Sequence, residues 1–307
     1  MTSQLGGTLE TLQVDLAGRQ LRLVLERRGP PGAPLWLLLP ALSTVSSRGE
    51  WQALAEAVGD QRQLVSFDWP GFGDSDRPAI PYDVALLCSA LRAVLSYLRT
   101  TTSQRTTVIA AGHSASVALG LAAEWSGLWQ ELVLVAPTWR GPLPTMTGWP
   151  SQRFGWLRHL VAAPWIGPAL YRLNTSRMVL RLMLRRHVWV DPALLTPARI
   201  REQQLLARRP GARFASVAFV SGGLDPADDR AWWLQQARLL RCPLQVVLAS
   251  EAPPRSRTEM EALGWQAADQ LSVIPGRLGL HQDCGALLAR QLLESDEGCL
   301  SLIQDFT

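Results

Sequence analysis

Apolar positions along the chain follow two spacings, and each spacing predicts one kind of element. Residues 9–29 alternate apolar and polar side chains around Ala17-Gly18-Arg19, which predicts an antiparallel hairpin. Short, largely apolar runs, of which residues 35–39 are continuous, predict buried strands of a parallel sheet. Such runs lie at residues 35–39, 64–69, 107–111, 132–136, 244–248 and 271–274.

Helical spacing separates these runs. It covers residues 50–58, 83–99, a stretch from 116 onward, 257–264 and 284–293. A chain in which strands and helices alternate in this way predicts an α/β fold, with a mostly parallel central sheet flanked by helices.

The alternation stops after the run that ends near Pro137. Residues 138–229 show no strand pattern and consist of Pro-broken helical stretches rich in Arg and Trp. We therefore predict a core made of residues 1–137 and 230–307, with residues 138–229 inserted as a helical cap. A cap at this point would cover the carboxyl edge of the sheet, where α/β proteins bind their ligands.

The segment Gly112-His113-Ser114-Ala115-Ser116 directly follows the strand predicted at 107–111. It is similar to the G-x-S-x-G nucleophile elbow, a sharp strand-to-helix turn, except that Ser116 replaces the second glycine. Such a turn needs very small residues two positions before and after its tip. The pattern predicts Ser114 as a nucleophile at the tip. The alternative is an ordinary strand-to-helix turn, because so short a pattern also arises by chance.

A serine hydroxyl becomes a nucleophile when a base takes its proton. His281 lies in the loop after the last predicted strand, where an elbow-type enzyme carries its base, and it follows Ser114 in the chain. We predict that His281 is this base. The alternative is a solvated loop histidine.

Four motifs together resemble the α/β-hydrolase fold superfamily over nearly the whole chain. They are LLLPALS at 37–43, DWPGFGDSD at 68–76, GHSAS at 112–116 and LGLH at 278–281. Three further segments are similar to a poorly characterised cyanobacterial and chloroplast group of capped α/β hydrolases. These are PALSTVSSR at 40–48, VAPTWRGPLP at 135–144 and RSRTEMEAL at 255–263.

The resemblance implies an oxyanion hole made of two backbone amides, those of Ala115 and Leu42. Leu42 lies in a loop where the family usually has His-Gly and this chain has Pro40-Ala41. Because the donors are backbone groups, we expect the hole to survive this change.

The resemblance also implies an acid in the loop after residues 244–248, usually an Asp just before Pro. This chain has Ala252 at the aligned position. Glu251 is the only carboxylate in that loop, so we predict Glu251 as the acid that orients His281. Asp225, which precedes Pro226, is the alternative.

These residues predict a serine hydrolase that cleaves a carboxylic ester through an acyl-enzyme intermediate, with no cofactor. Trp139 and Trp149, beside the expected pocket, predict a substrate with a hydrophobic group. A dehalogenase or epoxide hydrolase would need Asp at the elbow, so Ser114 argues against both of these enzyme classes.

The competing hypothesis is a catalytically weak or inactive scaffold that binds a hydrophobic ligand or a protein partner. Ser116 and Ala252 favour it.

Composition and charge limit the kinds of binding partner and the cellular location that we expect. All 30 basic residues are Arg, the net charge is +4, and no nucleic-acid recognition motif is present. No run reaches the roughly 18 apolar residues of a membrane span, and the N-terminus has no signal-peptide pattern, so we expect a cytoplasmic protein. The four cysteines are widely spaced, and the acidic residues of 68–76 suit turn hydrogen bonds, so we expect no metal site.

One helical segment of the expected cap combines charge with apolar residues. Arg177, Arg181 and Arg185 form a stripe within residues 176–186. This segment can cover a substrate pocket with its Arg side chains outward, or it can lie on an anionic membrane surface. The first interpretation is the preferred one.

Overall fold

The computed structural model of the chain describes residues 1–125, 127, 129–226 and 229–304. Eight strands form one sheet in the order β1-β2-β4-β3-β5-β6-β7-β8. The strands are β1 (Thr8–Leu16), β2 (Arg19–Arg28), β3 (Leu35–Leu39), β4 (Gln63–Phe67), β5 (Thr106–Ala111), β6 (Glu131–Val135), β7 (Leu244–Ala249) and β8 (Gln270–Ile274).

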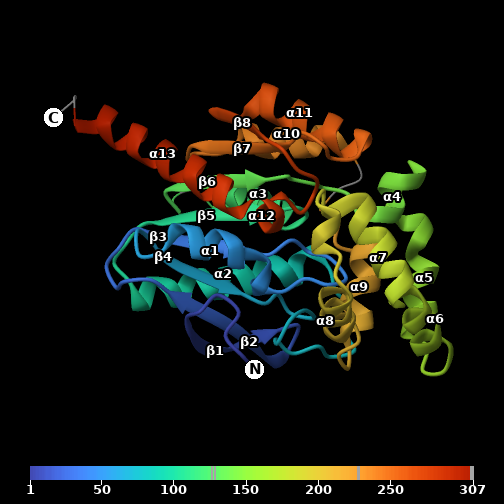
Figure 1. Cartoon of the computed structure of the whole chain (residues 1–307). Helices are drawn as coiled ribbons and strands as arrows, with labels where there is room; N and C mark the ends of the chain where they lie inside the picture. The colour runs from blue at the N-terminus through green and yellow to red at the C-terminus, as the bar shows by residue number, and fades with distance from the viewer. Residues whose placement is uncertain (126, 128, 227–228, 305–307) are drawn as a thin grey trace.

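Only the first two strands break the parallel arrangement of this sheet. β1 and β2 form an antiparallel hairpin, β2 also pairs antiparallel with β4, and every pairing from β4 to β8 is parallel. The central strands β3, β4 and β5 are buried along their whole length, as their largely apolar sequences predict. The predicted α/β fold with its N-terminal hairpin is confirmed (Figure 1).

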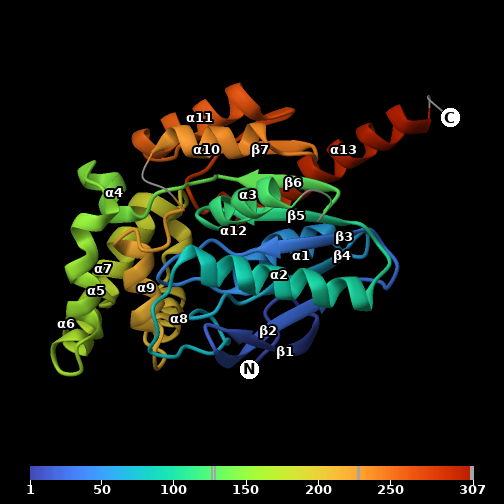
Figure 2. The same ribbon diagram turned by 180° about the vertical axis from the view of Figure 1, so that it is seen from behind.

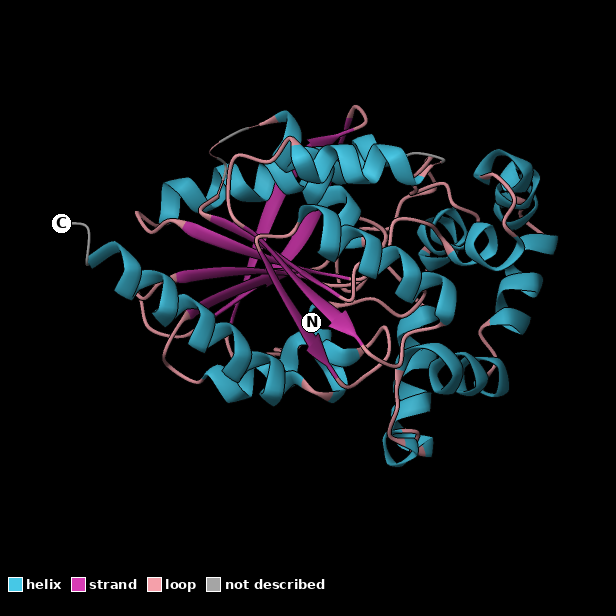
Figure 3. Ribbon diagram, turned by 90° about the horizontal axis from the view of Figure 1, so that it is seen from above, coloured by secondary structure: helices cyan, strands magenta, loops and turns pink. Residues whose placement is uncertain are grey.

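Helices cover both faces of the sheet (Figure 3). α1 packs against α13, while α2 and α10 pack against α3, and α10 also contacts α11. These helices are α1 (Gln52–Val58), α2 (Val84–Thr101), α3 (Ser114–Glu124), α10 (Arg230–Arg238), α11 (Pro254–Ala267), α12 (Leu280–Asp283) and α13 (Gly285–Gln304); a 3-10 turn, η1 (Arg48–Trp51), precedes α1.

Between β6 and α10, the described part of the chain contains helices and turns but no strand. Its elements are α4 (Pro142–Thr147), η2 (Ser151–Phe154), α5 (Gly155–Ala162), α6 (Ile166–Asn174), α7 (Arg177–Met183), the π-helical turn η3 (Leu184–Val188), η4 (Pro192–Leu194), α8 (Pro197–Ala207) and α9 (Ala212–Val220). They gather at one end of the sheet in both side views (Figures 1 and 2). The cap boundaries at 138 and 229 stay a prediction, and residues 227–228 lie outside the described residues.

α2 is long and apolar enough to cross a membrane by length and composition alone. Its apolar stripe is buried, however, and consists of Leu86, Leu87, Ala90, Leu91, Val94, Leu95 and Leu98. A long apolar helix of this kind is also found in the core of a globular domain, so its composition is explained by packing.

A buried ionic network lies beside the sheet. The Arg48 guanidinium donates to Glu26 at 3.0 Å, to Asp74 at 3.0 Å and to Asp68, and the side chains of Arg48, Glu26 and Asp68 are fully buried. Glu26 also accepts hydrogen bonds from the backbone of Gln4, Leu5 and Gly7. The network therefore joins the N-terminal segment to the loop after β4. Asp68 and Asp74 do make hydrogen bonds within their turn, as predicted, and they also neutralise Arg48.

Candidate functional site

The tip of the strand-to-helix turn after β5 is Gly112. Gly112 has a φ of +53°, a left-handed conformation that glycine adopts readily, whereas His113 already has helical angles of −74° and −20°. α3 begins at Ser114. The sharp turn predicted at Ser114 therefore lies two residues earlier, at a residue without a side chain.

Ser114 is fully buried, and its hydroxyl bonds to the main chain. The Oγ atom lies 2.7 Å from the carbonyl oxygen of Ala111 and 3.2 Å from that of Leu39. A serine hydroxyl in the first turn of a helix commonly bonds in this way to a carbonyl three residues earlier. Both carbonyl oxygens accept a hydrogen bond from the hydroxyl. A carbonyl oxygen is not a base that could remove the hydroxyl proton, so these contacts do not activate Ser114.

His281 lies in α12 and is fully buried. Its Nε2 atom is 3.2 Å from a carboxylate oxygen of Glu50, and its ring packs against Trp51 with 4.9 Å between ring centroids. The Nδ1 atom has no hydrogen-bond partner among the described residues. The histidine is therefore paired through one nitrogen with a carboxylate that the sequence analysis did not predict.

Glu50 comes from η1 and lies between His281 and the loop after β3. The same carboxylate oxygen accepts a 2.7 Å hydrogen bond from the backbone N–H of Ala41. Burial raises the pKa of the Glu50 carboxyl above its ordinary value, although the hydrogen bond to His281 acts in the opposite direction. Glu50 thus links the loop expected to form the oxyanion hole to the expected base.

The structure does not bring Glu251 to His281. The Glu251 side chain is exposed, while its backbone N–H donates to the carbonyl oxygen of Gly276 at 2.8 Å. The carboxylate on His281 belongs to Glu50, so the expected pairing is corrected. The alternative, Asp225, also lies elsewhere: it accepts a 2.8 Å hydrogen bond from the Gly141 N–H and contacts His113 at 3.4 Å.

The two backbone amides expected to form the oxyanion hole have different surroundings. The Ala115 N–H donates to Gly112 at 3.3 Å, inside the first turn of α3. Leu42 is buried in the loop after β3, next to Ala41, whose own amide is bonded to Glu50. An oxyanion role for Ala115 would compete with that helical hydrogen bond, and the roles of both amides stay a prediction.

The Glu50–His281 pair lies beside the tip of the turn through Ala41. A Cβ built on Gly112 would lie 3.0 Å from the Cβ of Ala41. The position facing this loop is thus Gly112, where an elbow enzyme would present its nucleophile, whereas the Ser114 hydroxyl points back at the main chain.

His113 is a packed neighbour of the turn, as the sequence suggested. Its Nε2 atom lies 3.0 Å from the carbonyl oxygen of Leu224, and its ring meets Phe219 edge-on. Burial lowers the pKa of His113 to about 4, so the ring is neutral near pH 7. His113 therefore joins the elbow to the segment that precedes α10.

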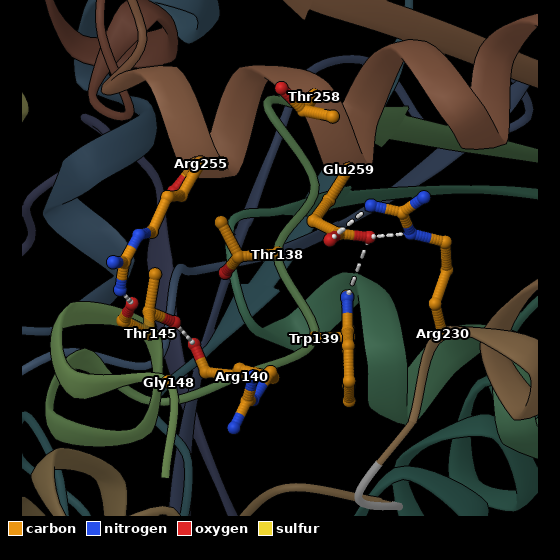
Figure 4. Close-up of a pocket in the computed structure, with 10 residues that line it drawn as sticks. Thr138, Trp139, Arg140, Thr145, Gly148, Arg230, Arg255, Thr258 and Glu259 are labelled. Atoms are coloured by element: carbon orange, nitrogen blue, oxygen red, sulfur yellow. Dashed lines mark hydrogen bonds and ion pairs between the residues drawn. The ribbon is translucent and has the colours of Figure 1, made fainter.

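A cavity of about 300 Å³ opens between the segment after β6 and helices α10 and α11 (Figure 4). Glu259 accepts hydrogen bonds from Arg230 at 2.6 and 2.7 Å, and from the Trp139 indole at 3.4 Å. Arg255 donates to the carbonyl oxygens of Thr145 and Met146. The lining residues are Thr138, Trp139, Arg140, Thr145, Gly148, Arg230, Arg255, Ser256, Thr258 and Glu259. Ser114 and His281 do not line this cavity.

Among the residues that the structure describes, no group of three or more His, Cys, Asp or Glu side chains could hold a metal ion.

Comparison with known proteins relates the chain to hydrolases. The sequence model described as "Alpha/beta hydrolase family" matches residues 31–285. No curated protein sequence matches the chain. Among solved structures, it is similar to Cfl2 from Burkholderia cenocepacia, with a TM-score of 0.68 and 22% identity over 94% of this chain and 96% of that one.

Two further similar structures carry names of hydrolases. One is the enol-lactonase from Burkholderia xenovorans, with a TM-score of 0.66 and 14% identity over 92% of this chain and 98% of that one. The other is a thermophilic esterase from Thermogutta terrifontis, with a TM-score of 0.67 and 18% identity over 94% of this chain and 98% of that one. The finer resemblance to the cyanobacterial and chloroplast group stays a prediction.

Proposed function

The chain belongs to the alpha/beta hydrolase family. We propose that it binds an amphiphilic anion and that it does not cleave an ester through Ser114. The observation that carries the proposal is the hydroxyl of Ser114, which is buried and bonded to the carbonyl oxygens of Ala111 and Leu39. An acyl-enzyme mechanism needs that hydroxyl in contact with a base.

The orientation of His281 gives independent support. The base of a serine hydrolase uses one ring nitrogen for the nucleophile and the other for the carboxylate. In His281 the Nε2 atom contacts Glu50, and the Nδ1 atom has no described partner. Of the two hydrogen bonds that define a Ser-His-acid relay, the structure thus contains the one between His281 and a carboxylate, and does not contain the one between His281 and Ser114.

The cavity beside Trp139 is the proposed ligand site. It lies after the carboxyl end of β6, at the edge where α/β sheets bind ligands. Three Arg side chains and one Glu line it, namely Arg140, Arg230, Arg255 and Glu259, so its formal charge is positive. The Trp139 indole beside three Arg side chains suits a ligand that joins an apolar group to a carboxylate.

Ester hydrolysis through Ser114 is the competing function. Ser114 and His281 are both present, and a carboxylate lies on His281, which favours this function. In that case Glu50 would take the role expected of Glu251. Turnover would also require the Ser114 hydroxyl to leave both carbonyl oxygens and turn toward His281.

A fluorophosphonate probe separates the two functions. We expect the folded protein to remain unlabelled, with Ser114→Ala behaving like the unsubstituted chain, because a hydroxyl without a base is a weak nucleophile. Labelling is followed by mass spectrometry, with an active serine esterase in the same reaction as positive control. Adduct formation at Ser114 that is lost in Ser114→Ala would establish the hydrolase function instead.

Calorimetric titration tests the ligand site. We expect decanoate to bind and decanol to bind at least about tenfold more weakly, because hydrogen bonds to a charged group are stronger than those to a neutral one. Arg255→Gln should weaken decanoate binding by about tenfold. Arg257→Gln, on the same helix and paired with Glu261, is the matched control and should change little. Equal binding of the acid and the alcohol would rule out an anion site.

A further inference from the structure

Three successive helices of the segment between β6 and β7 expose large apolar side chains. On α5, α6 and α7 these are Trp156, Ile166, Leu173, Met178 and Leu182, together with Trp165 directly before α6. Trp165 is 88% exposed, Met178 79% and Leu173 70%. We call this surface the outer cap face. Scattered apolar residues on a surface need no explanation, but a cluster on adjoining helices indicates an interaction site.

α6 shows most clearly that its apolar side is directed outward. Ile166, Leu170 and Leu173 recur at helical spacing, and all three are exposed. Gly167 is the one buried residue of this fully described helix, and a Cβ there would collide with the carbonyl oxygen of Val161 in α5. α6 therefore touches the protein through its glycine side and leaves its apolar stripe without a partner.

α7 adds positive charge beside this apolar surface. Its inward side is Leu180, followed by Leu184 at the start of η3. Met178 and Leu182 remain exposed, next to the exposed Arg177 and Arg181. Arg177, Arg181 and Arg185 do face outward, as the preferred interpretation expects, while only Leu180 and Leu184 of the apolar residues pack inward. The pocket-covering role of this segment stays a prediction.

The charge of the whole stretch is one-sided. Between Glu131 and Asp191 the sequence contains eight Arg and no Asp or Glu. Five of the eight, Arg172, Arg177, Arg181, Arg185 and Arg186, are exposed on or directly after α6 and α7. Trp with Arg and apolar side chains is the composition of helices that lie in the interface of an anionic bilayer.

We propose that the outer cap face docks on an anionic membrane surface. The basic charge favours anionic lipid over a second copy of this chain, because a symmetric contact would bring the same Arg side chains together. The place of these helices fits this role: α5 and α6 lie at the outer rim of the molecule, at the end away from the tip of α13 (Figures 1 and 2). This proposal does not depend on whether Ser114 is active.

Vesicle co-sedimentation of the full chain tests the proposal. We expect binding to vesicles that contain phosphatidylglycerol, little binding to pure phosphatidylcholine, and weaker binding as salt is added. Arg181→Gln combined with Arg186→Gln should lower the partition coefficient at least about tenfold, since each cation near an anionic surface contributes about fivefold. The matched control combines Arg241→Gln with Arg290→Gln, two exposed residues outside the outer cap face.

A tryptophan pair tests the apolar contribution. Trp165→Ala should reduce vesicle binding several-fold, because the indole is lost from the bilayer interface. Trp265 is 74% exposed on α11, and Trp265→Ala should bind as the unsubstituted chain does. The proposal would be overturned if Trp165→Ala and Trp265→Ala changed vesicle binding equally. It would also be overturned if the chain bound pure phosphatidylcholine vesicles as tightly as those that contain phosphatidylglycerol. A dimer in analytical ultracentrifugation that Trp165→Ala dissociates would overturn it as well, when vesicles are not bound.

Discussion

Arg48→Met is expected to lower the free energy of unfolding by about 3–5 kcal/mol, because it leaves buried carboxylates without their cation. Glu26 and Asp68 are fully buried, and both bond to the Arg48 guanidinium. Burial acts to raise the pKa of Glu26, yet hydrogen bonds from Ser3 and backbone amides hold it below its ordinary value. Glu26 is therefore charged near pH 7 in the native protein, and Arg48→Met takes the cation away from that charge. Urea denaturation at pH 7 measures the loss.

Arg257→Met is the matched control for this measurement. Arg257 pairs with Glu261 one helical turn away and is 51% exposed, so its removal should change stability by about 0.5 kcal/mol or less. If Arg48→Met does not yield folded protein, Arg48→Met combined with Asp68→Asn removes one buried charge and should recover part of the stability. A loss at Arg48 as small as that at Arg257 would contradict a structural role for the network.

The second large effect concerns pH. The pKa of His113 is lowered by burial to about 4 in the folded chain, against an ordinary value of 6.5. Below pH 6.5 His113 becomes protonated in the unfolded chain but stays neutral in the folded chain. The free energy of unfolding therefore falls as the pH is lowered toward 4. This one group should remove about 3 kcal/mol between pH 7 and pH 4.

His113→Gln isolates this contribution, since its amide can replace the Nε2–H group that faces Leu224. We expect the variant to lose about 3 kcal/mol less than the unsubstituted chain between pH 7 and pH 4, by urea denaturation at each pH. Asp283, whose pKa is raised by burial to about 6, acts in the opposite direction but is present in both proteins. His159→Gln, at an exposed position, should keep the full pH dependence. Parallel curves for the unsubstituted chain and His113→Gln would refute the assignment.

The elbow shows where sequence reasoning reaches its limit. Two overlapping patterns have small residues on both sides of a centre: one centred on Ser114, between Gly112 and Ser116, and one centred on Gly112, between Ala110 and Ser114. Both satisfy the steric demand of a sharp turn, and only the second has the left-handed backbone at its centre. Residue types alone cannot choose between two registers that differ by two positions.

Glu50 was missed for a different reason. The strands and core helices follow from local apolar spacing, and the contact between β5 and α3 follows from their neighbouring positions. The Glu50–His281 pair joins residues 231 positions apart. It depends on how η1 packs against α12, a tertiary arrangement for which neither segment carries a local signal. The expectation for Glu251 relied instead on the position usual in the family, and that loop leaves its carboxylate in solvent.

The Arg48 network also extends across the boundary of the helical segment. Arg209, in the turn between α8 and α9, bonds to Asp74, so one of the charges that neutralise this carboxylate comes from outside the core. Nearby, a Cβ on Gly71 would lie 2.4 Å from the Cβ of Ala215 in α9, which leaves no space between the two parts. Swinging α8 and α9 away would strip Asp74 of a cation and expose this close contact. The segment is therefore fixed at this end and cannot hinge there as a free lid, and it should melt together with the sheet in one cooperative transition.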